Sequence, residues 1–223
     1  SLYQLNILDT AAEEAFDALT QLATMICGVP ISVISLVDID RQWFKSKQGL
    51  SDDQTARDVS FCAHAILQPN QMLHVADASL DPRFADNPQV TASNGIRFYA
   101  GVPLVTDKGY ALGTLCVIDH KPHKISEEQK MALKVLSNNV IKLFELRKSK
   151  LELEAVQASL VERNGELERF ASIAAHDLKS PLANISSIVD LLKMDHLHEL
   201  SDEAKDLISL LDESSRQLRD LID

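Results

Sequence analysis

The side chains best suited to chemistry lie in residues 170–182, where His176 stands directly before Asp177. On a helix the two are about 100° apart, near enough for the carboxylate of Asp177 to accept a hydrogen bond from one ring nitrogen of His176. That bond would fix the tautomer whose other nitrogen can attack as a nucleophile, and it would stabilise the imidazolium that forms. Ser180 lies four residues on and shares the face of His176, while Pro181 removes a backbone donor and is expected to kink the helix.

A histidine idle on the surface of an amphipathic helix is the alternative to a nucleophile. Apolar residues recur here in alternating steps of four and three, which predicts a helical seam. The seam consists of Leu178, Leu182, Ile185, Val189 and Leu192. His176 lies roughly 200° from Leu178 and therefore points away from the seam. A reactive histidine and an idle one would both be exposed, so the preference for a reactive one comes from the whole string of residues 170–182.

Residues 170–182 resemble the phosphoacceptor box of sensor histidine kinases, and the resemblance extends from about Leu167 to the end of the chain. It implies that His176 accepts a phosphoryl group and that Asp177 is the base that orients it. It also implies that Ser180 positions a water for dephosphorylation, although Ser180 departs from the Asn or Thr more usual there. A response regulator receiver domain is expected to dock below His176. The residues expected to contact it are Asn184, Ser187, Ile188 and Leu191.

A long helix is predicted to lead into this stretch. It begins at a capping box formed by Ser126 and Gln129, and no proline follows until Pro181. Leucines then recur every seven residues, as in a coiled coil. They are Leu146, Leu153, Leu160 and Leu167. A helix from Glu127 to about Met194 would be roughly 100 Å long at 1.5 Å per residue, and a monomer would have nothing to bury its apolar stripe against. We therefore expect a parallel homodimer.

The end of the chain predicts a second helix and a bundle. The apolar pattern slips by one residue between Leu167 and Leu178, a stutter that changes the supercoil locally. Ser201, followed by two acidic residues, is a good start for a second helix. Two such hairpins, one from each chain, would close a four-helix bundle. We expect the slip to let this bundle choose between two packings that change access to His176.

The first half of the sequence alternates short apolar runs with turn residues. Thr10 and Glu13 predict a capping box for a helix that ends at Gly28. Residues 77–95, rich in Asp, Pro, Asn and Ser, predict a long ordered loop. Strands are predicted at residues 31–37, 41–48, 72–75, 97–105 and 111–118, with a helical or irregular segment at 60–67. Helices that flank and interrupt these strands favour an antiparallel α+β domain.

This half, about residues 5–145, resembles a GAF domain, the small-molecule sensor module related to PAS domains. The resemblance rests on four segments taken as a set. They are residues 60–66, 75–84, 95–104 and 112–119. It implies a PAS-like antiparallel sheet with flanking helices and a pocket for an unidentified small-molecule ligand. The motifs by which some relatives attach a bilin or bind a cyclic nucleotide are not found.

Other residues of this half are candidates for a site. Cys62 and His64 form a Cys-x-His pair, but two ligands do not make a zinc site and no second pair with ligand spacing follows. Cys62 is therefore interpreted as a small core residue. A further set of residues could converge on a pocket or could pin the long loop by ion pairs, and we favour the loop. This set is Arg57, Asp77, Arg83, Arg97 and Tyr99.

Composition limits the classes of partner. The 223 residues carry a formal net charge of −11, which argues against binding to nucleic acid or to an anionic membrane. Cys27, Cys62 and Cys116 lack Cys-x-x-Cys spacing and have apolar neighbours, which favours reduced thiols in a cytoplasmic protein. No apolar run approaches the roughly 20 residues of a membrane span, and no signal peptide is visible. The chain starts without an initiator Met and stops within a helical seam, so we expect a fragment of a longer protein.

These patterns together predict the sensing and phosphoacceptor part of a two-component sensor histidine kinase. The expected architecture is an α+β GAF domain joined by a long coiled-coil helix to an all-α helical hairpin, which forms a four-helix bundle in the dimer. The expected parts are a GAF sensor (residues 1–145), a coiled-coil signalling linker (146–168) and a dimerisation and histidine phosphotransfer domain (169–223).

The activity is expected to depend on a missing part. The resemblance implies an ATP-binding catalytic domain that supplies ATP and Mg²⁺, and no motif of that domain is found. We therefore expect no cofactor in this chain and no autophosphorylation by this chain alone. Two alternatives stay open: a non-catalytic dimeric scaffold, and a GAF ligand sensor or photosensor with a secondary role in phosphorelay.

Overall fold

A computed structural model describes residues 2–196, 198 and 200–222 of the chain. Clustering of its contacts divides the chain into two compact units, Ser1–Glu152 and Leu153–Asp223. Helix α4 (Glu127–Leu191) contributes residues to both units. Each unit has its own set of buried residues.

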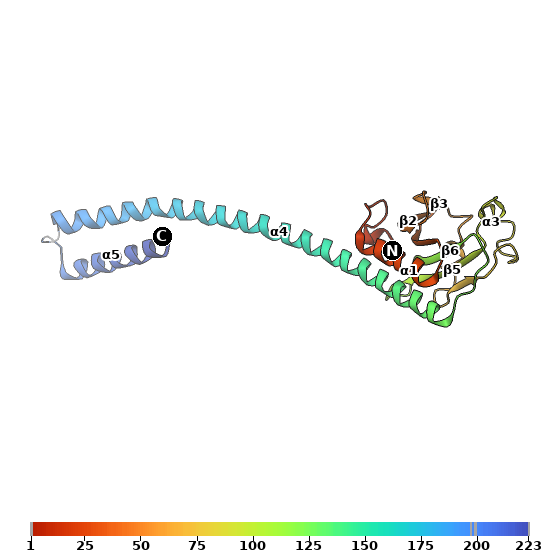
Figure 1. Ribbon diagram of the computed structural model, residues 1–223. Coiled ribbons are helices and arrows are strands. Elements are labelled where there is room, and N and C mark those ends of the chain that lie inside the picture. The colour runs from red at the N-terminus through yellow and green to blue at the C-terminus, as the bar shows by residue number, and fades with distance from the viewer. Residues whose placement is uncertain (1, 197, 199, 223) are drawn as a thin grey trace. The chain divides into compact units, whose positions relative to one another are not determined.

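Unit 1 is built on a β-sheet (Figure 1). The sheet has six antiparallel strands in the order β3-β2-β1-β6-β5-β4. Its strands are β1 (Ile31–Val37), β2 (Arg41–Gln48), β3 (Gln54–Ala56), β4 (Leu73–Val75), β5 (Phe98–Val105) and β6 (Ala111–Asp119). Its other elements are η1 (Leu2–Leu5), α1 (Glu14–Cys27), α2 (Phe61–Ala65), α3 (Pro88–Thr91) and the first part of α4. The predicted antiparallel α+β domain is therefore confirmed.

Helices cover both faces of this sheet. On one face α1 and α4 pack against the strands, and the rings of Phe16 and Phe144 lie 5.2 Å apart. On the other face lie α2 and α3, which join a second core. Side chains along β6 alternate between the two cores: Leu115 and Val117 face the α1 side, and Cys116 faces the α2 side. Burial on both faces explains why the central strands are nearly continuous apolar runs.

The start of α1 differs from the sequence prediction. The capping box of Thr10 and Glu13 is wrong, because the helix begins at Glu14 and no side chain caps it. Instead Lys45 of β2, whose side chain is fully buried, donates to Thr10 Oγ1 at 2.9 Å and pairs with Glu13 at 2.6 Å. Arg147 of α4 binds the same carboxylate at 2.5 Å. A buried ammonium group without acceptors costs more free energy than an uncapped helix end that water can solvate. Thr10 and Glu13 therefore accept hydrogen bonds from Lys45 and do not cap the helix.

The start of α4 follows the sequence prediction. The backbone N–H of Ser126 donates to Gln129 Oε1 at 2.8 Å, and the N–H of Gln129 donates to Ser126 Oγ at 3.3 Å. The capping box predicted for this helix is confirmed. It fixes the helix start directly after the loop that follows β6.

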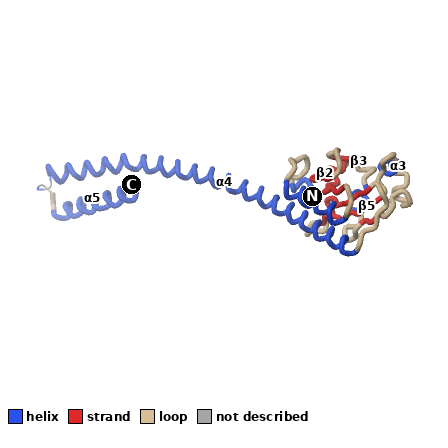
Figure 2. Tube along the Cα trace, in the orientation of Figure 1, coloured by secondary structure: helices blue, strands red, loops and turns tan. Residues whose placement is uncertain are grey.

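Unit 2 is a helical hairpin. A short π-helical segment (Leu192–His196) follows α4, and α5 (Asp202–Ile222) runs back beside the end of α4 (Figure 2). Leu182 and Val189 of α4 are buried within the hairpin, and Arg219 of α5 donates to Ser186 Oγ. Several other leucines and isoleucines of the two helices stay exposed in the single chain. They include Leu178, Ile185, Leu207, Leu211, Leu218 and Leu221.

A charged cluster that the sequence analysis missed joins the two helices. Asp212 of α5 is largely buried and accepts hydrogen bonds from Lys193 Nζ at 2.6 Å and from Arg216 Nε at 3.2 Å. The hydrogen bond from Lys193, aided by the charge of Arg216, holds the pKa of Asp212 below its usual value. The i, i+4 spacing of Asp212 and Arg216 predicts an ion pair on one helix. Lys193 comes from the other side of the turn, so local spacing does not predict its contact with Asp212.

Candidate functional site

His176 lies on α4 in unit 2, and its side chain is 87% exposed. Its Nδ1 atom is 3.3 Å from Oδ1 of Asp177, whose side chain is 73% exposed. This distance is at the long end of the range for a hydrogen bond. With Nδ1 protonated, the ring donates to the carboxylate and leaves the Nε2 lone pair open to solvent. Pro181 lies inside α4, which continues to Leu191, and the expected kink stays a prediction.

The residues expected to contact a regulator share one exposed face of α4 with His176. At about 100° per residue, all of them lie within roughly 120° of His176 around the helix. This His176 stripe consists of His176, Ser180, Asn184, Ser187, Ile188 and Leu191, all exposed. Measured in the same direction round the helix, the buried Leu182 and Val189 lie at about 220–240°, opposite the middle of this stripe. Packing of the hairpin therefore leaves the whole stripe open.

A second candidate site is a cavity of about 120 Å³ in unit 1. Its wall includes Cys62 and Tyr99 together with several polar residues. The polar residues are Gln42, Asp52, Thr55, Gln89 and His120. Binding sites for drug-sized molecules are usually about 300–1,000 Å³, so this cavity suits only a ligand of a few heavy atoms.

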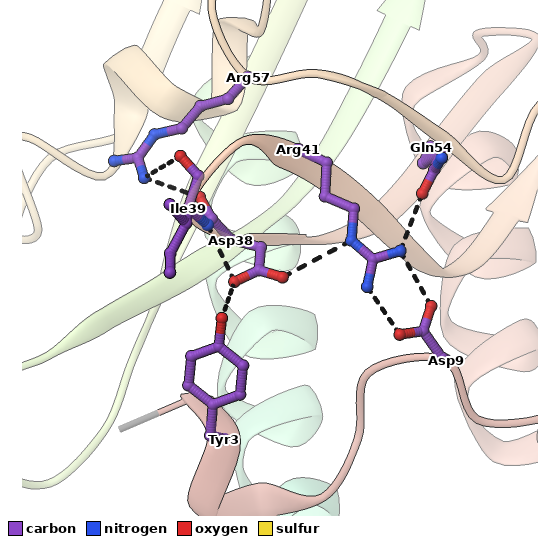
Figure 3. Close-up of polar contacts among 7 residues, drawn as sticks. All are labelled: Tyr3, Asp9, Asp38, Ile39, Arg41, Gln54 and Arg57. Atoms are coloured by element: carbon purple, nitrogen blue, oxygen red, sulfur yellow. Dashed lines mark hydrogen bonds and ion pairs between the residues drawn. The ribbon is translucent and has the colours of Figure 1, made fainter.

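The charged residues weighed for a pocket lie at separate places. Arg57 donates to the carbonyl oxygens of Asp38 at 2.7 Å and Ile39 at 3.3 Å, so it holds the turn between β1 and β2 (Figure 3). Beside it, Arg41 pairs with Asp9 at 2.6 Å (Figure 3). Arg57 therefore belongs to a turn and not to the cavity.

Arg83 and Arg97 hold the loop of residues 77–95. Arg83 pairs with Asp81 at 2.6 Å, and Arg97 donates to the carbonyl oxygen of Val90 at 2.8 Å. Asp77 accepts from the hydroxyl of Ser79 at 2.6 Å. The preferred interpretation, that these residues pin the loop, is confirmed for Arg83 and Arg97, by an ion pair in the first case and hydrogen bonds in the second.

Among residues 2–196, 198 and 200–222, no group of three or more His, Cys, Asp or Glu side chains is placed to hold a metal ion. Within that same part of the chain, no helix combines the length and the apolar character needed to cross a membrane.

The fold and the exposed His176 define a signalling protein of the sensor-kinase type: a sensor domain, a long helix and a histidine-bearing hairpin. Comparison with known families agrees. The family described as "GAF domain" matches residues 11–142, and "His Kinase A (phospho-acceptor) domain" matches residues 166–223. The chain therefore belongs to the GAF domain family and carries a HisKA domain after it, the domain order of a GAF-containing sensor histidine kinase.

Individual proteins also resemble this chain. The chain is 38% identical over 218 residues to "Cyclic di-GMP phosphodiesterase PA2567" of Pseudomonas aeruginosa, which covers 92% of this chain and 36% of that protein. It is 38% identical over 72 residues to "Phytochrome-like protein Cph1" of Synechocystis sp., which covers 32% of this chain and 10% of that protein. The chain thus spans about a third and a tenth of these relatives.

A solved structure supports the fold of unit 1. The GAF domain from an Acinetobacter phosphoenolpyruvate-protein phosphotransferase aligns with a TM-score of 0.50 at 18% identity, covering 66% of this chain and 92% of that one. At this identity the likeness concerns the fold alone.

Proposed function

We propose that this chain is the sensing and phosphoacceptor part of a two-component sensor histidine kinase. His176 takes a phosphoryl group from ATP and passes it to an aspartate of a response regulator. The observation that carries the proposal is the exposed imidazole whose Nδ1 lies 3.3 Å from the carboxylate of Asp177. In the same proposal, residues 1–145 are the sensor, 146–168 the signalling linker and 169–223 the phosphotransfer domain, all in the cytoplasm.

The reaction follows from the tautomer of His176. Nδ1–H donates to Asp177, so the Nε2 lone pair attacks the γ-phosphorus of ATP. The N–P bond forms as the bond from that phosphorus to the bridging oxygen breaks, and ADP leaves. The ring becomes positively charged in this step, and the neighbouring carboxylate stabilises that charge and can accept the Nδ1 proton. ATP and Mg²⁺ are held by an ATP-binding catalytic domain outside this chain.

Phosphotransfer onward requires a regulator beside His176. The exposed face that runs from His176 through Asn184, Ser187 and Ile188 to Leu191 spans about 22 Å at 1.5 Å per residue. It combines hydroxyl and amide groups with two exposed apolar side chains, a mixture typical of transient protein interfaces. Ser180 lies one turn from His176 on this face, where its hydroxyl could orient a water for dephosphorylation.

A homodimer would cover the apolar faces that the single chain leaves open. Leu207, Leu211 and Leu218 of α5 are exposed although they follow the seam spacing of a helix bundle. Leu178 and Ile185 of α4 are exposed in the same way. Two hairpins packed through these faces would form the four-helix bundle and leave His176 outside. Domains of this phosphoacceptor family are typically dimeric.

Phosphorylation in trans tests the proposal. The chain is incubated with radiolabelled ATP, Mg²⁺ and a separately supplied ATP-binding domain, and the acid lability of the label is measured. We expect an acid-labile phosphoryl group that His176→Gln abolishes and that His198→Gln, a matched exposed histidine of unit 2, leaves unchanged. Asp177→Asn should slow labelling by about 10²-fold or more. Label that persists in His176→Gln would show that this histidine is idle, as in the scaffold alternative.

A further inference from the structure

Two cysteines lie together in the core between the sheet and α2. Cys62 comes from α2 and Cys116 from β6, and their Sγ atoms are 3.9 Å apart. Both side chains are buried and neither is in a disulfide. The sequence alone predicted Cys62 to be a small core residue. The residues around it in the sequence give no sign of Cys116, which follows 54 residues later.

Hydrogen-bond donors converge on the Cys62 sulfur. The hydroxyl of Thr114 donates to it at 3.0 Å and the hydroxyl of Tyr99 at 3.3 Å. The Cys116 thiol can donate to this sulfur at 3.9 Å or to the carbonyl oxygen of Val33 at 3.6 Å. The hydroxyl of Ser35 lies 3.3 Å from that of Thr114. A neutral thiol is a weak acceptor and needs no such set of donors, whereas a thiolate does.

The same contacts give the two thiols different pKa values. Burial alone would raise the pKa of Cys62, but the hydrogen bonds from Cys116, Ser35, Thr114 and Tyr99 outweigh burial and hold the pKa below its ordinary value. The contact with Cys62, reinforced by burial, raises the pKa of Cys116 well above its usual value. The pair thus consists of one sulfur suited to attack and one protonated neighbour.

The cavity of about 120 Å³ gives a reactant room beside Cys62, which lines it. Thr55 also lines it, and its buried Oγ1 atom has no hydrogen-bond partner within the described part of the chain. A hydroperoxide has two reacting oxygen atoms and fits such a space, whereas a ligand of drug size does not.

We propose that Cys62 and Cys116 are a hydroperoxide-reactive pair, in which Cys62 is the attacking sulfur and Cys116 the resolving thiol. The Cys62 thiolate attacks one oxygen of hydrogen peroxide, so that an S–O bond forms and the O–O bond breaks. The leaving hydroxide takes a proton and becomes water. Cys116 then attacks the sulfenic sulfur of Cys62, the S–O bond breaks, and the departing hydroxide takes the proton of Cys116. Two thiols and one peroxide yield a disulfide and two waters.

Disulfide formation would move α2, β6 or both, because these two elements carry the cysteines. A disulfide brings its sulfurs to about 2.05 Å, so the 3.9 Å separation must close by roughly 2 Å. Phe61, next to Cys62, stacks on Phe84 at 4.1 Å and on Tyr99 at 5.1 Å, so its packing shifts with the helix. Oxidation by peroxide would therefore change the packing of the core that contains α2. This site does not include His176, and the inference stands or falls independently of phosphotransfer.

Peroxide treatment of the full chain tests the pair. After the reaction, free thiols are alkylated under denaturing conditions, and the peptides are mapped by mass spectrometry. We expect a linked pair of peptides holding Cys62 and Cys116 and a Cys27 that is still alkylated. Cys27→Ser is the matched control, because this buried thiol lies in the other core and burial raises its pKa to about 11. It should leave disulfide formation unchanged.

Two variants then separate the steps. Cys116→Ser should stop at a sulfenic acid on Cys62, which dimedone traps once the chain is denatured. Tyr99→Phe removes one donor, so it should slow oxidation at neutral pH and shift the rate profile to higher pH. Each unit by which the pKa of Cys62 rises above about 7 lowers the thiolate fraction at pH 7, and with it the rate, by roughly tenfold. Fluorescence of Trp43 checks that each variant is folded. Peptide maps of the unmodified sequence that show no Cys62–Cys116 link, or equal oxidation of Cys27, would overturn the proposal.

Discussion

Replacing Phe144 by alanine tests whether the start of α4 is part of the sensor core. Phe144 is 2% exposed, and its ring lies 5.2 Å from that of Phe16 on α1. Truncating a buried Phe to Ala typically costs about 3–5 kcal/mol, of which the loss of apolar burial accounts for about 2–3 and the cavity and lost ring contact for the rest. We expect Phe144→Ala to lower the free energy of unfolding of unit 1 by about 4 kcal/mol.

Urea unfolding followed by the fluorescence of Trp43 measures this change. Trp43 is the one tryptophan of the chain and is buried in the core of unit 1, so its signal reports on that unit. With a slope of about 2 kcal/mol per M, the midpoint should fall by roughly 2 M. Met131→Ala is the matched control, because Met131 lies on the same helix but is 69% exposed, and its effect should stay within about 0.5 kcal/mol. If Phe144→Ala behaves like this control, α4 is not anchored on the sheet.

Two further perturbations address unit 2. Leu211→Glu places a charge on the exposed leucine face of α5 and should shift the proposed homodimer toward monomer, measured by light scattering after size exclusion. Glu213→Gln, at an exposed residue of the same helix, should not. The hydrogen bond from Lys193 lowers the pKa of Asp212 in the folded chain below its unfolded value of 3.8. The ionised Asp212 therefore stabilises the hairpin above about pH 3.8, and this stabilisation is lost as the pH falls through the pKa of the folded state. Asp212→Asn should therefore remove part of the acid dependence of helix melting, followed by circular dichroism between about pH 5 and pH 1.

The strands of the sensor were predictable because their sequences record burial on two faces. Residues 31–37 and 41–48 were predicted as strands, and β1 and β2 occupy those same residues. The edge strand β3 was missed, since its three residues have no apolar pattern and its pairing with β2 comes from tertiary contact. The capping box at Thr10 failed for a related reason. A buried lysine on β2 competes for the same oxygen atoms, and local sequence does not reveal Lys45.

The candidate sites differ in the same way. His176 and Asp177 are adjacent in the sequence, so a local pattern was enough to find them. Asp212 and Lys193 meet across a turn, and Cys62 and Cys116 meet across the sheet, so only the fold brings them together. Residue type alone gave Cys62 the interpretation of a core residue. The burial of Cys62 agrees with that interpretation. The hydrogen bonds that its sulfur accepts from the hydroxyl groups of Tyr99 and Thr114 do not.

Strand β6 offers a physical route from the thiol pair to the signalling helix. Cys116 faces the core that contains α2, while Leu115 and Val117 face the core that contains α4. Closing the disulfide would displace β6 or α2, and only displacement of β6 changes the packing of Leu133 and the other α4 residues of that core. Oxidation can bias His176 only if two packings of α4 differ in free energy with and without the disulfide. Such coupling is reciprocal, so a bias of about 1–3 kcal/mol on the helix must appear as an equal shift in the redox equilibrium of the thiols.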